Sequence, residues 1–137
     1  MIMNRQNHIP VAIVALNNET ADQDIRALRL AGFKKFKQVS GVWKGTKEAS
    51  YVVPLLEAHH LLAVASLAYE HHQQAILLVD NQRGATLIDL RDGGSMVRSY
   101  LGRFISVDKH TAQQCDSYTH DEHTNTYYTV LSRERVW

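Results

Sequence analysis

Residues 41–51 read GVWKGTKEASY, and the GTK in the middle is typical of a tight turn. The preceding residues 33–43 mix apolar side chains with lysines, which indicates a strand with one face in water. The following residues 49–53, ASYVV, favour a second strand. We therefore predict an antiparallel hairpin whose turn is flanked by Trp43 and Glu48.

Helices and further strands are predicted on both sides of this hairpin. Apolar β-branched runs indicate buried strands, and apolar residues at helical spacing, with Gly32 as a stop signal, indicate helices. The predicted elements are a strand over 11–16, a helix over 21–32, a helix over 54–74, and strands over 75–80 and 85–90 joined by the turn NQRG. Their order is β-α-β-β-α-β with an added strand.

The C-terminal part of the chain has a less regular pattern. We predict a turn over 91–94, a short strand over 95–101, a long polar loop over 108–123 and a closing strand over 124–131. The fold class that fits best is α+β: a ferredoxin-like split β-α-β sandwich with an antiparallel sheet, two main helices and extra C-terminal strands. Residues 1–137 are predicted to form one domain.

The composition is that of an ordinary globular protein. The chain has 137 residues, 45% hydrophobic and 21% charged, and a net charge of +1 that favours neither nucleic acid nor anionic membrane. The single cysteine, Cys115, excludes an internal disulfide and fits a reducing compartment. The N-terminal apolar run has no convincing cleavage site, and no stretch approaches the ~20 apolar residues of a membrane span. We expect a soluble, cytoplasmic protein.

Eight histidines raise the question of a metal site. Cys115, His120 and His123 are ligand types that zinc accepts, but their C-x4-H-x2-H spacing matches no common zinc module. The two pairs of adjacent histidines on the second predicted helix point in different directions and cannot readily share one ion. We predict that the protein binds no metal.

Sequence motifs for other chemistries are missing. No serine stands in a nucleophile-elbow context, and no phosphate-binding G-x-x-x-x-G-K or G-x-G-x-x-G is present. Lys34, Lys35 and Lys37 could contact phosphates, but lysines on a half-exposed strand usually form a solvated face.

Trp43 and Glu48 allow two interpretations. An aromatic plane and a carboxylate beside one turn could converge on a ligand that carries an amine or sulfonium cation. Alternatively, Trp43 is a core residue and Glu48 is an edge charge that discourages aggregation, which composition alone would favour.

Several segments, in this order, resemble a known family, the phage-encoded S-adenosylmethionine lyases, long described as hydrolases. They are VAIVAL, a helix ending in LRLAGF, GVWKGTKEASYVV, LLAVASLAYE, ILLVDNQRGATLI and YLGRFISV. The resemblance implies a ferredoxin-like subunit, a homotrimer and substrate sites at the subunit interfaces. It also implies cleavage of S-adenosylmethionine to methylthioadenosine and homoserine lactone without metal or added cofactor, which deprives methylation-dependent host defences of their methyl donor.

The same resemblance implies roles for individual residues. Glu48 matches a glutamate that contacts the methionyl amine of the substrate, and Trp43 stands where the family has a tyrosine near the reacting centre. Indole can stack on a cation but has no phenolic oxygen. We assign Glu48 as the catalytic residue, and Glu48, Trp43 and Ser50 to substrate binding.

Two alternatives to this function stay open. One is a non-enzymatic phage protein that binds a nucleotide-like signal or a host protein on the same trimeric scaffold. The other is a lyase that acts on an adenylylated derivative of S-adenosylmethionine. A pocket around Glu48 favours an enzyme, whereas an exposed Glu48 on a convex surface favours the non-enzymatic protein.

Overall fold

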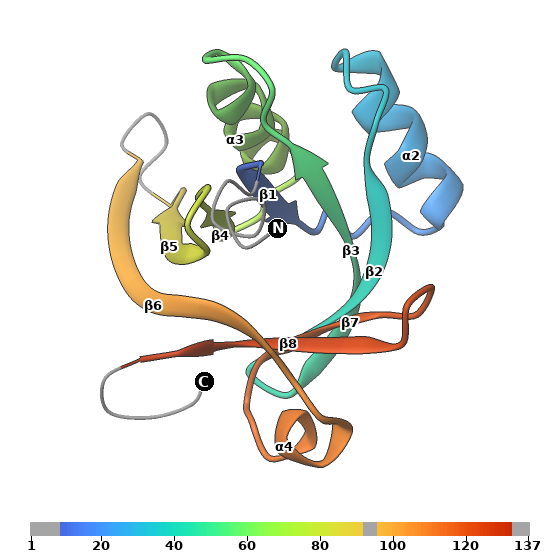
Figure 1. The fold of residues 1–137 in the computed structure, drawn as a ribbon. Coiled ribbons are helices and arrows are strands. Elements are labelled where there is room, and N and C mark those ends of the chain that lie inside the picture. The colour runs from blue at the N-terminus through green and yellow to red at the C-terminus, as the bar shows by residue number, and fades with distance from the viewer. Residues whose placement is uncertain (1–8, 92–95, 133–137) are drawn as a thin grey trace.

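In the computed structural model, which describes residues 9–91 and 96–132, one antiparallel sheet curls round until its two ends pair (Figure 1). The strands of the described residues close into a barrel in the order β1-β3-β2-β7-β8-β6-β5-β4. They are β1 (Val11–Val14), β2 (Lys37–Trp43), β3 (Thr46–Pro54), β4 (Ala75–Val79), β5 (Gly84–Asp89), β6 (Val97–Val107), β7 (Tyr118–Asp121) and β8 (Thr126–Leu131). The helices are α2 (Ala21–Leu30), α3 (His60–Glu70) and α4 (Lys109–Gln113).

Helices α2 and α3 lie together on one side of the barrel, and α4 lies on the far side next to β8 (Figure 1). Helix α2 begins where the sequence predicts, because Thr20 and Gln23 form a reciprocal capping box. No helix among the described residues is long and apolar enough to cross a membrane.

Alternating side chains of β1 belong to two different apolar clusters. Ala12 and Val14 are buried against side chains of α2 and α3, whereas Val11 and Ile13 belong to a second cluster inside the barrel. The strand predicted over 11–16 is therefore present over Val11–Val14, with one face buried and the other half-buried. The interior cluster is built around Val79, Ala85, Phe104 and Val130.

A buried polar contact fastens α2 to the barrel. Tyr51 of β3 has no exposed surface, and its hydroxyl donates a hydrogen bond of 2.9 Å to Asp24 Oδ2. Asp24 Oδ1 also accepts a hydrogen bond from the Asn18 backbone. Burial, and next the hydrogen bond to Asp24, raise the pKa of Tyr51 well above its usual range, so the phenol stays protonated.

The ferredoxin-like sandwich predicted from the sequence is wrong. The β-α-β-β-α-β order is present over residues 11–79, but β2 pairs with β7 and β4 pairs with β5, so the sheet does not stop at these strands. Strand β6 completes the closure because it pairs with β5 along its first half and with β8 along its second half. Gly102 permits this bend: its φ is +144°, and a Cβ there would collide with the Leu131 carbonyl.

Other element boundaries also differ from the predictions. The second helix begins at His60, because Pro54 is still paired with Val11 as the last residue of β3. The predicted polar loop over 108–123 contains α4 and β7, and the strand predicted over 95–101 extends to Val107. The hairpin of β2 and β3 is confirmed, with register pairs from Lys37↔Val52 to Trp43↔Thr46. Most of the predicted 91–94 turn lies outside the described residues, as do residues 1–8 of the N-terminal run.

Candidate active site

A cavity of about 420 Å³ opens at the end of the barrel where β1 ends and β3 and β4 begin. Its walls combine interior side chains of the barrel with polar residues at the mouth. The polar lining includes Asn17, Glu48, Ser50, Gln73, Asp89, Arg91 and Thr119, and the aromatic lining includes Trp43, Phe104, Tyr118 and Tyr128.

The three residues predicted to bind substrate all line this cavity. Glu48 and Ser50 stand two positions apart on β3, so their side chains lie on the same face of the strand. Across the hairpin, Glu48 pairs with Gly41, and Trp43 follows two residues later on the same face of β2. Trp43 is 37% exposed and is therefore not the core residue of the alternative interpretation.

The Glu48 carboxylate is held by a neutral donor. Asn17 Nδ2 donates a hydrogen bond of 3.1 Å to Glu48 Oε2. Within residues 9–91 and 96–132, Glu48 has no ion-pair partner. Its negative charge is thus available to a cation that enters the cavity.

Gly41 leaves room for the Ser50 hydroxyl. A Cβ built at Gly41 would lie 2.6 Å from Ser50 Oγ, so any larger residue would displace the serine side chain. Ser50 is 5% exposed, and its hydroxyl offers the cavity both a donor and an acceptor. In the sequence, the only sign of this contact is a glycine, Gly41, within a predicted strand.

A model of the S-adenosylmethionine lyase family matches residues 14–131, which contain the barrel except the first three residues of β1, and all of the cavity lining except Ile13. The chain belongs to this family. It is therefore an enzyme that cleaves S-adenosylmethionine, and the non-enzymatic alternative is not supported. No curated protein matches the sequence.

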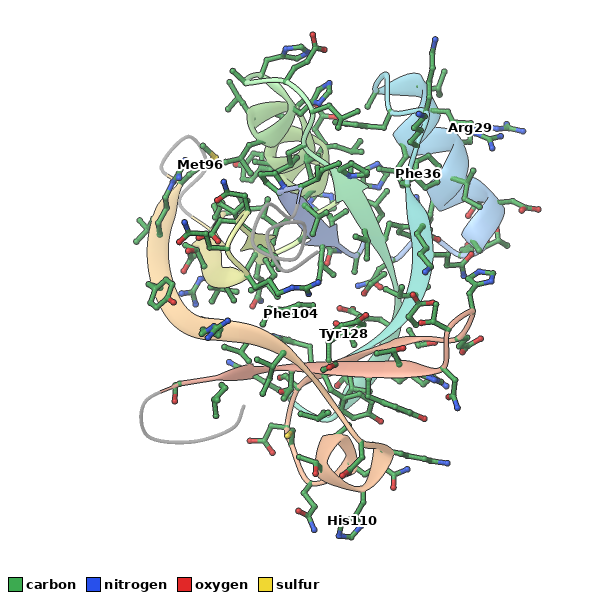
Figure 2. The ribbon with its side chains drawn as sticks, in the orientation of Figure 1. Arg29, Phe36, Met96, Phe104, His110 and Tyr128 are labelled. Atoms are coloured by element: carbon green, nitrogen blue, oxygen red, sulfur yellow. The ribbon has the colours of Figure 1, made fainter. Side chains whose placement is uncertain are left out.

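The lyase also has an aromatic wall that the sequence did not indicate. Phe104 of β6 and Tyr128 of β8 stack with ring centroids 5.1 Å apart and an interplanar angle of 8°. Figure 2 shows the two labelled side chains next to each other. Both side chains line the cavity together with Tyr118. Such a wall suits a planar heterocycle.

An ion pair lies at the rim of the lyase cavity. The Arg91 guanidinium contacts the Asp89 carboxylate through Nε at 3.1 Å and Nη2 at 2.5 Å. These hydrogen bonds from Arg91 lower the pKa of Asp89 to about 2. Asp89 is thus ionised at neutral pH, but its charge is balanced by Arg91, unlike that of Glu48.

The residues considered for zinc do not assemble a site in this lyase. His120 stacks on Tyr127 at 4.0 Å, and the Cys115 thiol donates to the Thr111 carbonyl. Cys115, His120 and His123 do not form a group of converging ligand atoms. Absence of metal remains a prediction.

Among the described residues, ligand atoms do converge at Glu57, His59 and His60. His60 Nδ1 accepts hydrogen bonds from the backbone N–H groups of Leu56 and Glu57, both at 3.1 Å. A neutral ring that accepts at Nδ1 carries its proton on Nε2, 3.4 Å from Glu57 Oε2. A metal on Nε2 would need the opposite tautomer, so this cluster fits a turn that precedes α3 rather than a metal centre.

Proposed function

We propose that the protein converts S-adenosylmethionine to methylthioadenosine and homoserine lactone, with Glu48 binding the substrate ammonium. The observation that supports this proposal best is the Glu48 carboxylate, which lines a cavity, has no cationic partner among the described residues and lies beside Trp43. A zwitterionic ligand with two cationic centres suits a site that combines one unbalanced carboxylate with aromatic rings.

The proposed step is an intramolecular substitution. A carboxylate oxygen of the methionyl group attacks the substrate γ-carbon, and the bond from that carbon to the sulfonium sulfur breaks with its electron pair going to sulfur. The products are a neutral thioether and a lactone that keeps its ammonium. No water is consumed and no proton is transferred, so the protein has to supply geometry and electrostatic stabilisation only.

Five of the cavity residues have a place in this scheme. Glu48 anchors the ammonium, which leaves the substrate carboxylate free to fold toward the γ-carbon. Trp43 packs near the sulfonium or the adenine, and the Phe104–Tyr128 wall offers a second surface for the purine. Because the scheme needs no proton transfer, an indole at position 43 is compatible with turnover. Ser50 supplies a hydroxyl for a polar group of the substrate.

The proposal extends to the setting of the reaction. We expect a metal-independent, cofactor-independent homotrimer in the cytoplasm, encoded by a phage and acting against host defences that need a methyl donor. Loss of S-adenosylmethionine would disable such defences without direct contact with nucleic acid or membrane.

The test is incubation with S-adenosylmethionine in water enriched in ¹⁸O. The early products are separated by chromatography, and their masses are measured by mass spectrometry. We expect methylthioadenosine and a lactone without label. Early homoserine that carries ¹⁸O would indicate attack by water and contradict the intramolecular step. No methylthioadenosine at all would overturn the proposed products.

A further inference from the structure

We infer that Asn17 is a positioning residue that orders the Glu48 carboxylate for its cationic ligand, with Gln73 as the support of Asn17. The inference rests on the proposed function, because it concerns the residue proposed to bind the substrate ammonium. All three side chains line the cavity.

The backbone places Asn17 directly opposite Glu48. The β1–β3 pairing ends at Val14↔Tyr51, and three more residues along the same antiparallel register bring Asn17 across from Glu48. Strand β1 has already ended, and Asn17 has a φ of +56°. In this left-handed conformation, which asparagine tolerates better than most residues, the side chain replaces the backbone ladder as the link to β3.

Hydrogen bonds fix the orientation of both amides. Gln73 Nε2 donates to the backbone carbonyls of Leu16 at 3.4 Å and His71 at 3.2 Å, and these oxygens can only accept. Gln73 therefore turns Oε1 toward Asn17 Nδ2, 3.5 Å away. The same Nδ2 donates to Glu48 Oε2, and a carboxylate also only accepts, so no other orientation of Asn17 satisfies both partners.

This arrangement orders Glu48 without neutralising it. A glutamate side chain without contacts loses conformational entropy when it binds a ligand. The Asn17 contact already restricts the Glu48 side chain, so less entropy is lost on binding. A lysine or arginine in the same place would also hold the carboxylate, but its charge would compete with a cationic ligand. An ionised carboxylate offers about four acceptor positions, and Asn17 uses one of them. The others remain for the donors of an ammonium group.

The test variant is Asn17→Gly. Glycine adopts a positive φ without strain, so the substitution removes the amide but keeps the backbone, whereas alanine would add strain. The matched control is Asn125→Gly, because Asn125 also has a positive φ (+50°), makes a solvent-exposed hydrogen bond to His120 and does not line the cavity. For Asn17→Gly, we expect the KM for S-adenosylmethionine to rise roughly three- to tenfold, the effect of one lost hydrogen bond. kcat should change little, because an ammonium anchor binds substrate and transition state alike.

A double-mutant cycle separates positioning from general destabilisation. Binding of S-adenosylhomocysteine, which keeps the ammonium but lacks a sulfonium leaving group, is measured for Asn17→Gly, Glu48→Ala and the double variant. If Asn17 acts through Glu48, the Kd of the double variant equals that of Glu48→Ala alone. Gln73→Ala should raise the Kd by a smaller factor, and this effect should also vanish without Glu48.

Wild-type KM and Kd in Asn17→Gly would overturn the inference. Factors for Asn17 and Glu48 that multiply independently in the double variant would overturn it too. Failure of the proposed function looks different, because then the wild-type protein itself neither forms methylthioadenosine nor binds S-adenosylhomocysteine. Equal effects of Asn17→Gly and Asn125→Gly on KM would assign the change to chain flexibility and also contradict the inference.

Discussion

The Glu48 carboxylate is held in place without a cationic partner among the described residues. A neutral amide from the segment that follows β1 donates a hydrogen bond to one oxygen, and no described residue forms an ion pair with Glu48. Asp89 in the same cavity has the opposite environment, since Arg91 balances its charge. Of the two cavity carboxylates, Glu48 is therefore the one suited to a cation.

Replacement of Glu48 by glutamine tests this difference. The shape and the contact with Asn17 can persist, but a charge-assisted hydrogen bond to the substrate becomes a neutral one, a loss on the order of 1.5–3 kcal/mol. We expect kcat/KM for S-adenosylmethionine to fall roughly ten- to hundredfold, with an unchanged melting temperature. The control is Glu70→Gln, an exposed glutamate outside the cavity. A fully active Glu48→Gln enzyme would exclude the assigned role.

Gly41 offers a second test at this scale. In Gly41→Ala, the new Cβ would approach Ser50 Oγ to 2.6 Å and force the hydroxyl to move. We expect a loss of stability of about 1 kcal/mol and weaker substrate binding. Adding Ser50→Ala should restore the melting temperature, because the clashing oxygen is gone. No recovery in the double variant would show that the strain lies elsewhere.

Pairs of elements are joined by polar contacts that lie outside the cavity. Tyr51 connects β3 to Asp24 of α2, and Lys37 of β2 forms an ion pair with Asp121 of β7. Burial alone would raise the pKa of Asp121, but the Lys37 ammonium and the His123 and Thr124 backbone N–H groups lower it overall. Both contacts hold the strands that carry Glu48 and Trp43 within the barrel.

Loss of the Tyr51 hydroxyl should loosen α2. In Tyr51→Phe, the buried Asp24 carboxylate loses a donor, which we expect to lower the free energy of unfolding by about 1–3 kcal/mol. Thermal or urea unfolding measures this change, with Tyr100→Phe on the exposed face of β6 as the control. Equal stability of the two variants would show that the Tyr51 hydroxyl contributes nothing.

The same pair predicts a dependence on alkaline pH. The pKa of Tyr51 is raised in the folded protein, whereas in the unfolded chain the phenol ionises near its ordinary value of about 10. Its contribution to stability is therefore complete below pH 10 and is lost as the pH rises toward the folded pKa. The stability difference between wild type and Tyr51→Phe, followed by urea unfolding from pH 8 to 11, should shrink above pH 10. A constant difference would contradict this explanation.

At the scale of the whole molecule, closure of the barrel determines which surfaces can associate with other subunits. A ferredoxin-like sheet would leave β2 and β4 as open edges that could pair with another subunit, but here β7 and β5 pair with these two strands. Exposed apolar side chains of the barrel include Val97 and Tyr100 on β6, 52% and 67% exposed, and Trp43 at the cavity mouth. Association that covers such side chains remains favourable.

We therefore keep the prediction of a homotrimer. Light scattering at micromolar concentration should give three times the chain mass of 15.6 kDa. A monomer of full activity would rule out sites that are shared between subunits.

The prediction of a metal-free enzyme is tested on the whole molecule as well. Treatment with a strong chelator should leave activity and melting temperature unchanged, because no free energy of metal binding would be lost. A substantial fall in melting temperature, restored by zinc, would show that the cysteine and histidines of the C-terminal part bind an ion after all.

The sequence by itself determined the features that depend on neighbouring residues. The spacing of apolar residues, the stop signal at Gly32 and the turn residues act within a few positions, and they correctly predicted the β2–β3 hairpin and helix α2. Only the tertiary structure decided barrel closure, the strand within residues 108–123 and the cavity. These depend on contacts between distant residues, such as Asn17 with Glu48, 31 positions apart, and Lys37 with Asp121, 84 positions apart. No local sequence pattern encodes such contacts, because they form only when the strands that carry these residues pair in the sheet.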